Sequence, residues 1–344
     1  MTEAVLAIDV GSGTQDILLY LPGKNLENCP KMVMPSQTQI IAQRIRQVTA
    51  EGRDLFLSGV LMGGGASTVA LKAHIKAGLK AYATPAAAKT FHDNLEIVKA
   101  LGVELVREQP QGTSEVRLGD LDLPGLGRVL EEFGLKLPER IAVAVQDHGE
   151  TVVMSNREFR FRFWQEFIAG GGELKDLMYD RPPEYFTRMG ALRDLAPGCK
   201  VMDTGAAAVW GILSDPVAAA RREKGLIALN IGNSHTLGLA IKGTRVLGLF
   251  EHHTGQINSG FLLEQVKRLQ TGDITNQEVF GMGGHGAYLH PDFPGGFEFV
   301  VLTGPRWEMA RDLGFYRAAP FGDMMLAGCF GLLAAMGIIS IDKG

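Results

Sequence analysis

Two stretches of the chain repeat one succession of apolar and polar positions. Residues 7–20 read AIDVGSGTQDILLY and residues 228–241 read ALNIGNSHTLGLAI, so that Gly11 corresponds to Gly232. In each copy, an apolar run is followed by a turn rich in Gly, Ser, Thr or Asn and then by a second apolar run. Two such runs joined by a short glycine-containing turn predict a β-hairpin. The chain is therefore expected to consist of two related halves, each opening with a hairpin.

A third strand is expected after each hairpin, and helices then alternate with strands. The third strands are predicted at 31–34 and 245–250. The first half continues with helix 37–49, strand 54–62, helix 66–77, strand 79–84, helix 86–101, strand 103–106, a proline- and glycine-rich loop at 108–138 and a buried strand at 141–145. This alternation indicates an α/β architecture.

Two later segments predict helices of different kinds. Phe159, Phe163 and Phe167 stand at helical spacing with arginines between them. This pattern favours an amphipathic helix with a solvated arginine face over a nucleic-acid-binding surface. Residues 324–339 are uncharged and mostly apolar, but sixteen residues fall short of the ~20 that span a bilayer. We expect a helix buried on all sides, in which small residues allow close backbone approach.

Composition narrows the function classes. The 344 residues carry a formal net charge of −4, which argues against a nucleic-acid partner. Cys29, Cys199 and Cys329 lie far apart in the sequence, which fits a reducing cytosol rather than a disulfide framework. The apolar run at 4–8 has no basic region before it, so no signal peptide is expected. We therefore expect a cytoplasmic protein without membrane segments.

The two hairpin turns have the composition of phosphate-binding loops. Glycine removes the Cβ barrier, so backbone N–H groups around Gly11 can approach an anion closely. Asp9, at the end of the preceding strand, would hold Mg²⁺ through water, because Mg²⁺ prefers carboxylates together with retained waters and phosphates. The second turn, 230–236, adds further hydroxyl side chains. Two such loops in related halves predict a nucleotide clamped between two domains.

Five motifs in a fixed order resemble those of a known superfamily. They are IDVGSGT (8–14), VMDTGAAAVWGIL (201–213), LNIGNSHT (229–236), FVVLTGP (299–305) and FGDMMLAGCFGLLAAMG (321–337). They are similar to the first phosphate loop, first connecting helix, second phosphate loop, adenosine loop and second connecting helix of actin, the seventy-kilodalton heat-shock chaperones, sugar kinases and acetate kinases. The whole chain also resembles a prokaryotic family sometimes labelled pyruvate formate-lyase activating. Radical chemistry is not expected, because an iron–sulfur site needs clustered cysteine thiolates.

The resemblance implies a fold and a domain organisation. We expect two ribonuclease-H-like (actin-like ATPase) domains with a nucleotide cleft between them. The first would span 1–215, with an insertion near 80–200, and would be completed by a C-terminal helix at 322–344. The second would span 216–321. ATP or ADP and Mg²⁺ are the implied cofactors.

The resemblance also assigns roles to individual residues. Phosphate contacts are implied for Gly11, Ser12, Gly13, Thr14, Gln15, Gly232, Asn233, Ser234 and Thr236, nucleoside contacts for Thr303 and Gly304, and metal contacts for Asp9 and Asn230. The superfamily commonly has Asp at position 230 and Gly at position 305, where this chain has Asn230 and Pro305. Asp203, with Asp147 as a second carboxylate, is assigned to activating a water or hydroxyl. The alternative for Asp203 is a helix N-cap, and both roles are compatible.

Histidines and carboxylates gather between the loop motifs. His148 and Glu150 follow the strand at 141–145, where ligand-binding residues often lie in α/β sheets. The other members are Glu251, His252, His253 and His285. We consider this group as contacts for substrate or a second metal, against the alternative that each is an ordinary satisfied side chain. Zinc would require three or four ligands converging on one point.

Three functions remain at this stage. The first is a Mg-ATP-dependent phosphotransferase or ATPase acting on a small-molecule or protein acceptor that the sequence does not identify. The alternative is a nucleotide-gated activator whose slow hydrolysis switches a partner enzyme. A metal-dependent nuclease on the same fold is the third, and it is disfavoured by the acidic net charge and by the two phosphate loops.

Overall fold

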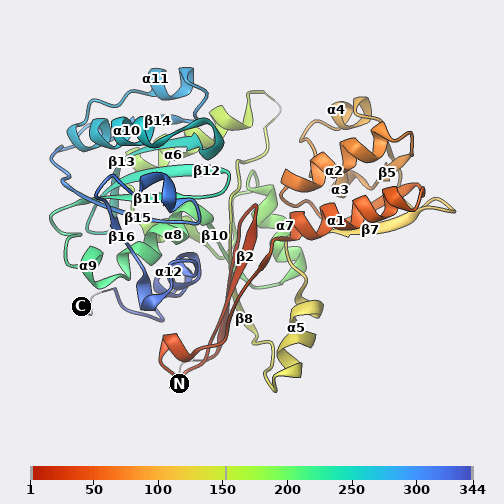
Figure 1. The fold of residues 1–344 in the computed structure, drawn as a ribbon, viewed down its shortest axis with the longest axis horizontal. Coiled ribbons are helices and arrows are strands. Elements are labelled where there is room, and N and C mark those ends of the chain that lie inside the picture. Colours follow the sequence, from red (N-terminus) through yellow and green to blue (C-terminus); the bar gives the residue numbers. More distant parts are fainter. Residues whose placement is uncertain (1–2, 152, 342–344) are drawn as a thin grey trace.

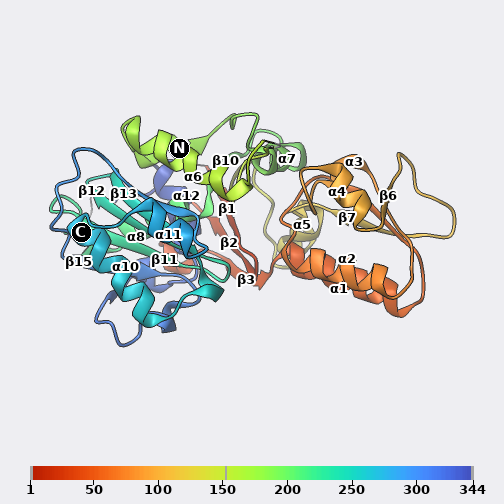
Figure 2. The same cartoon turned by 90° about the horizontal axis from the view of Figure 1, so that it is seen from above.

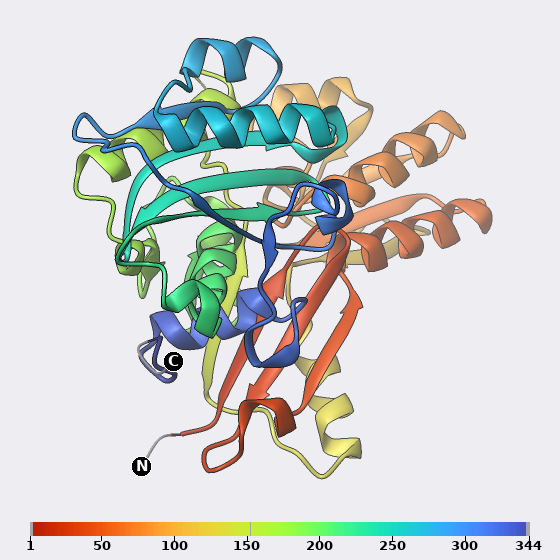
Figure 3. The ribbon, with the colours of Figure 1, turned by 60° about the vertical axis from the view of Figure 1, so that its left-hand side comes forward.

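The computed structural model describes residues 3–151 and 153–341, and its core is a pair of six-stranded sheets (Figures 1 and 3). The first sheet has the order β3-β2-β1-β8-β10-β9, with β1 (Val5–Val10), β2 (Thr14–Tyr20), β3 (Lys31–Pro35), β8 (Arg140–Val145), β9 (Met178–Tyr179) and β10 (Lys200–Asp203). The second has the order β14-β13-β12-β11-β15-β16, with β11 (Leu226–Ile231), β12 (His235–Lys242), β13 (Arg245–His253), β14 (Gly286–Leu289), β15 (Phe299–Thr303) and β16 (Tyr316–Arg317).

The two sheets share one topology. In each, three consecutive strands form an antiparallel meander (β1-β2-β3 and β11-β12-β13), and the first of them also pairs in parallel with a later strand, β8 or β15. A further strand, β10 in the first sheet and β16 in the second, pairs in parallel with β8 or β15. Five strands of each sheet therefore have the same arrangement. This repeated order is that of two ribonuclease-H-like (actin-like ATPase) domains, so the predicted fold class is confirmed.

Two helices join the sheets. α12 (Ala327–Ala335) packs on β1, β2 and β8, α8 (Thr204–Leu213) packs on β11 and β15, and the two helices pack against each other. A Cβ atom on Gly331 would lie 1.8 Å from the Ala207 carbonyl oxygen, and one on Gly211 would lie 1.9 Å from the Ala327 carbonyl oxygen. The close backbone approach predicted from the small residues is therefore present. The buried helix expected over 324–339 is shorter, because α12 covers only 327–335 and the residues after it are partly or fully exposed.

A third sheet forms the insertion in the first domain. It has four parallel strands in the order β6-β5-β4-β7, and lies apart from the other sheets, on the right in Figures 1 and 2. Its elements are α1 (Gln37–Ala50), β4 (Leu55–Gly59), α2 (Gly65–Lys76), β5 (Ala81–Ala83), α3 (Pro85–Ala88), α4 (Leu95–Ala100), β6 (Val103–Leu105), β7 (Ser114–Leu118) and, after it, α5 (Leu123–Glu132).

The position of this sheet differs from the insertion expected near 80–200. β4 and β5 read as alternating α/β elements of the main domain, but they pair with β6 and β7 instead. Within the expected range, 140–145 and 200–203 supply β8 and β10 of the first main sheet. All strands of the second sheet lie within 216–321. The exact domain limits stay a prediction, and residues 342–344 of the predicted C-terminal segment lie outside the described residues.

Two further predictions in the insertion were wrong. The segment 108–138 was expected to be a loop because of its prolines and glycines, yet it contains β7 and α5. Pro124 lies in the first turn of α5, where proline is well tolerated, and Asp122 caps that helix. The helix expected at 86–101 is divided into α3 and α4, because Asn94 caps a new helix start.

The remaining helices cover the outer faces of the sheets. They are α6 (Asn156–Ala169), α7 (Thr187–Leu195), α9 (Pro216–Ala219), α10 (Ser259–Thr271) and α11 (Asn276–Gly281). α6 was expected to carry a solvated arginine face, and Arg162 is indeed exposed, but Arg160 is only 3% exposed. Among the described residues, none of the helices combines the length and apolar character needed to cross a bilayer.

Candidate functional site

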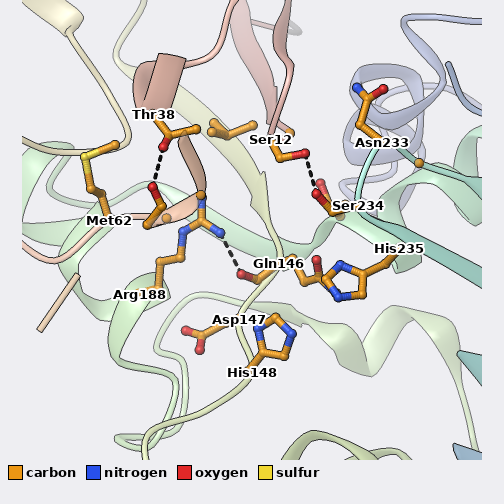
Figure 4. Close-up of a pocket in the computed structure, with 18 of the residues that line it drawn as sticks. Ser12, Thr38, Met62, Gln146, Asp147, His148, Arg188, Asn233, Ser234 and His235 are labelled. Atoms are coloured by element: carbon orange, nitrogen blue, oxygen red, sulfur yellow. Dashed lines mark hydrogen bonds between the residues drawn. The ribbon is translucent and has the colours of Figure 1, made fainter. Parts of the chain in front are cut away.

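A pocket of about 410 Å³ lies where the two main domains and the insertion meet (Figure 4). Both hairpin turns reach it from the main sheets, and the ends of β4 and β8 reach it from the insertion and the first sheet. The pocket is therefore built from all three parts of the chain.

The two predicted phosphate loops have the same turn and contact each other. The N–H of Gly11 donates to Thr14 O and the N–H of Gly232 donates to His235 O, both at 2.9 Å. Between the loops, the Ser234 hydroxyl donates to the Ser12 hydroxyl oxygen at 2.7 Å (Figure 4). The duplicated hairpins thus bring two equivalent turns to one point.

Glycines in these loops leave room for close contacts. A Cβ atom on Gly13 would lie 2.6 Å from the side-chain amide nitrogen of Asn233 in the other loop, so the Asn233 side chain would have to move. A Cβ atom on Gly232 would lie 2.9 Å from the backbone oxygen of His235 in its own loop, so the tight second turn favours glycine there.

Two carboxylates face each other at the start of the first loop. Asp9 and Asp16 are opposite residues of the β1–β2 hairpin, and both line the pocket. Burial raises the pKa of Asp9 to about 7, although the Thr204 hydroxyl, which donates to it, opposes the shift. Burial and the charge of Asp9 raise the pKa of Asp16 to about 8. One oxygen of Asp16 has no hydrogen-bond partner among the described residues, so this pair is able to receive a cation.

Asp203 belongs to a buried ion network rather than to the pocket wall. Arg160 donates through Nη1 to Asp203 at 2.8 Å and through Nε to both oxygens of Glu251 at 3.0 and 2.8 Å. The other Asp203 oxygen accepts from the N–H of Gly205 at 2.9 Å and caps α8. The N-cap alternative is therefore present, and Arg160 and Glu251 are the members of the network that line the pocket.

Asp147 lines the pocket but uses both oxygens to hold the backbone. Its oxygens accept from the N–H groups of Gly149 at 2.9 Å and Met189 at 3.0 Å. Burial raises its pKa, against the opposing effect of these two hydrogen bonds. The preceding residue of α7, Arg188, pairs with Asp120 of the insertion at 2.7 Å and donates to Gln146 O (Figure 4). This part of the site fixes the insertion against the first domain.

The insertion contributes the ends of its strands. Gly63, Gly64 and Gly65 follow β4 and precede α2, and Lys89 and Thr90 follow α3. Ligands of open parallel sheets bind at the carboxyl ends of the strands, which is the edge that faces this pocket. Lys89 donates to both oxygens of Glu150, at 2.6 and 2.9 Å. The Glu150 carboxylate therefore binds a residue of the insertion.

The predicted adenosine loop lies beside the pocket. Thr303 and Gly304 end β15, which is paired with β11. Gly304 has φ = +105°, and a Cβ atom there would lie 2.5 Å from Ile231 O, so glycine is required at this turn. Pro305 lines the pocket, whereas the other two do not.

Three histidines from separate parts of the chain come together. The ligand nitrogens of His148, His235 and His285 all lie within 4.8 Å of one another. Burial lowers the pKa of all three, to about 4 for His235 and about 3 for His285, so they are neutral near pH 7. His252 and His253 stand beside this group, with burial lowering the pKa of each as well.

The predicted residues divide into those that line the pocket and those that do not. Those that do are Asp9, Gly11, Ser12, Thr14, Asp147, His148, Asn230, Gly232, Asn233, Ser234 and Glu251. Those that stand behind or beside its wall are Gly13, Gln15, Glu150, Asp203, Thr236, His252, His253, His285, Thr303 and Gly304. Gln15 donates to Pro35 O, and Thr236 pairs with Thr254. The roles assigned to these residues stay predictions.

Sequence reasoning missed several residues of the pocket. Asp16 could have been found from the hairpin register, which places it opposite Asp9. The three glycines at 63–65, between a strand and a helix, were a readable signal of a ligand loop. Nothing in the local sequence distinguishes His235 or Arg160, because their partners come from distant segments.

The chain was compared with known families and structures. Residues 62–309 match a family model described as "Putative pyruvate format-lyase activating enzyme (DUF1786)". The chain belongs to this family. The match covers more than half of the chain and confirms the family resemblance seen in the sequence. No curated protein matches this DUF1786 member.

Several solved structures resemble this DUF1786 member at low identity. A Bacteroides thetaiotaomicron protein with an actin-like ATPase fold and unknown function has 8% identity and a TM-score of 0.38, covering 95% of each chain. The Ppx/GppA phosphatase of Aquifex aeolicus has 11% identity and a TM-score of 0.31, covering 88% of this chain and 68% of that one. EutJ, an ethanolamine utilization protein from Carboxydothermus hydrogenoformans, has 12% identity and a TM-score of 0.28, covering 96% and 89%. The fold assignment rests on strand topology, not on these values.

Proposed function

We propose that this protein binds ATP or ADP with Mg²⁺ between its two main domains and transfers or hydrolyses the terminal phosphate. The observation that carries the proposal is the meeting of two equivalent glycine-containing turns, one from each domain, at a single pocket. Glycines within each turn remove side chains that would block an anion. One such turn would be an ordinary hairpin, but two that converge are expected of a phosphate clamp.

The residues present fit the proposed ligands. The backbone N–H groups at the tips of the two turns, 12–13 and 233–234, would hold the phosphates, because those of Gly11 and Gly232 already donate within their turns. Asp9 and Asp16 would hold Mg²⁺, with Asn230 at the position of the second domain equivalent to Asp9. Mg²⁺ bound there would neutralise the charge that phosphoryl transfer develops. Asp16 has an oxygen without a partner among the described residues, which fits a cation ligand held partly through water.

A small anionic or hydroxylated acceptor is the class of substrate that the pocket favours. Its wall opposite the phosphate loops is made by the ends of the insertion strands, with Gly63 to Gly65, Thr38 and Lys89. The glycine backbone, hydroxyl and ammonium groups of this wall support a small polar molecule as the acceptor. We therefore favour a phosphotransferase or ATPase over a nucleotide-gated activator.

The family description suggests activation of a radical enzyme, and the cysteines do not support that chemistry. Iron–sulfur clusters of this kind are held by grouped thiolates. Cys29, Cys199 and Cys329 are all buried, and they lie before β3, before β10 and within α12. Among the described residues, no cysteine belongs to a group of three or more potential metal ligands.

We expect Mg²⁺ to tighten ATP binding by at least ~10-fold in the wild type, which corresponds to about 1.4 kcal/mol. In Asp9→Asn this Mg²⁺ dependence should be lost, because the variant lacks one of the two facing carboxylates. Titration calorimetry with ATP, with and without Mg²⁺, measures this Mg²⁺ dependence in the wild type and in the variant. Asp312→Asn, a change at an exposed residue that does not line the pocket, should behave like the wild type. Absence of nucleotide binding at millimolar concentration would refute the proposal.

ATP turnover distinguishes a phosphotransferase or ATPase from a nucleotide-gated activator. The purified chain should release ADP from Mg-ATP in the presence of a screen of small hydroxylated and carboxylated acceptors. A nucleotide-gated activator would bind Mg-ATP with the same dependence but would turn over only when its partner is added. Binding without turnover across the screen would therefore favour the activator.

A further inference from the structure

The strongest feature outside the proposed nucleotide site is the histidine group. His148 follows β8 of the first domain, His235 begins β12 and His285 precedes β14 of the second domain. Their ring centroids are 5.4, 5.5 and 4.9 Å apart for the pairs 148–235, 148–285 and 235–285. The fold therefore brings together three imidazoles that are distant in sequence.

Several ring nitrogens of this group lack partners among the described residues. Both nitrogens of the His235 ring and Nδ1 of His285 are buried and have no hydrogen-bond partner there. His285 is only 1% exposed. Buried polar groups are nearly always hydrogen-bonded, and exceptions often mark a bound ion or water. Two neighbouring histidines with buried, unsatisfied nitrogens are thus an observation that an ordinary core histidine does not explain.

We infer that His148, His235 and His285 form a binding site for a divalent transition metal of the zinc class. Neutral imidazole is the ligand form of histidine, and burial keeps all three rings neutral near pH 7. In a tetrahedral zinc site with Zn–N distances of ~2.0–2.1 Å, the nitrogens stand about 3.4 Å apart. In this structure the ligand nitrogens lie within 4.8 Å of one another. Modest rotations of the rings would therefore bring them to the spacing of a metal site.

The charged neighbours of the group act in opposite directions. At His235 and His285 the Glu251 carboxylate raises the pKa more than Arg160 lowers it, so these two rings have a net favourable environment for a cation. At His148 the effect of Arg160 is the larger one. Arg160 is itself paired with Glu251 and Asp203.

The open side of the site faces the pocket. His148 and His235 line the pocket, and their rings lie next to each other in Figure 4, whereas His285 stands behind them. Three protein ligands leave a fourth position for water or a substrate oxygen. Because His235 directly follows Ser234 of the second phosphate loop, this position lies beside the phosphate loops of the proposed nucleotide site. The inference itself requires no nucleotide.

The test uses the full chain, stripped with a chelator and free of nucleotide. Co²⁺ should bind with one ion per chain and give the strong visible absorption of a tetrahedral site, and Zn²⁺ should displace it. His148→Gln, on the pocket wall, and His285→Gln, behind it, should each weaken binding by at least the ~10–100-fold that loss of an outer-shell partner costs. His92→Gln removes an exposed histidine and should bind like the wild type.

Folding of each variant is checked by circular dichroism and by its thermal midpoint. Zn²⁺ should raise the midpoint of the wild type, because an ion held by both domains stabilises the native state, and should leave that of folded His148→Gln nearly unchanged. A wild type that binds no Co²⁺ overturns the inference. So does equal binding by wild type and His148→Gln, which would indicate adventitious surface histidines. Failure of ATP binding alone would refute the nucleotide proposal and leave this site intact.

Discussion

Arg160→Met is expected to lower the free energy of unfolding by about 3–5 kcal/mol, because breaking a buried ion network from one side leaves uncompensated charges. Arg160 is 3% exposed and is the shared partner of Asp203 and Glu251, which are themselves 4% and 1% exposed. Methionine fills a similar volume but donates no hydrogen bond. Chemical denaturation of wild type and variant at neutral pH measures the difference.

A triple variant separates charge from packing. Arg160→Met combined with Asp203→Asn and Glu251→Gln removes the buried charges together, and asparagine still caps helix α8 well. Most of the lost stability should return, since replacing all members of a buried network is often near neutral. If the triple variant is as unstable as Arg160→Met, uncompensated charge is not the cause.

The same network predicts a pH dependence. Burial has the largest single effect and raises the pKa of Glu251. The Arg160 charge, the nearby His285 and His235 and the hydrogen bonds from Arg160 together lower it more, so the net pKa lies well below the ordinary value. The stability from this pair is therefore complete above the ordinary carboxylate pKa and declines as the pH falls below it. In Arg160→Met, the unpaired carboxylates take up protons more readily. The stability gap between wild type and variant should thus narrow in acid.

The two repeated hairpins could be predicted because the residues that form each hairpin lie close together in the sequence. Each hairpin combines a short glycine-containing turn with apolar runs, and the strands β1 and β11 are apolar because they are buried at the centre of their sheets. The loop positions around Gly11 and Gly232 followed from that pattern. The family resemblance added the two connecting helices at 201–213 and 321–337.

The other residues of the site are brought together by contacts between distant segments, which a local sequence pattern does not reveal. Arg160 looks like Arg162 in the sequence, yet one is buried between two carboxylates and the other is exposed beside Glu166. His235 appears as part of a phosphate loop, and its neighbours His148 and His285 arrive from distant strand ends. The insertion was misplaced for a similar reason, because strand order within parallel sheets is set by tertiary pairing.

Gly331→Ala should destabilise the protein although alanine is the better helix former. A Cβ atom at this position would lie 1.8 Å from Ala207 O and 2.7 Å from the Gly211 nitrogen, both backbone atoms of α8. Neither can rotate away, so α8 and α12 must separate. We expect a loss at the upper end of the ~1–3 kcal/mol typical of overpacking, and a larger loss for Gly331→Leu.

Gly127→Ala supplies the matched control for this prediction. It makes the same change inside helix α5, where a Cβ atom would meet nothing within 4 Å. There alanine should stabilise by roughly 0.4–1 kcal/mol, because it restricts the unfolded chain without a clash. Thermal midpoints of the two variants should therefore move in opposite directions from the wild type. A Gly331→Ala protein as stable as the wild type would show that α8 and α12 do not approach as closely as described. Since these helices join the two main sheets, their separation should also weaken the pocket between them, so the midpoint shift caused by Mg-ATP should be smaller in Gly331→Ala than in Gly127→Ala.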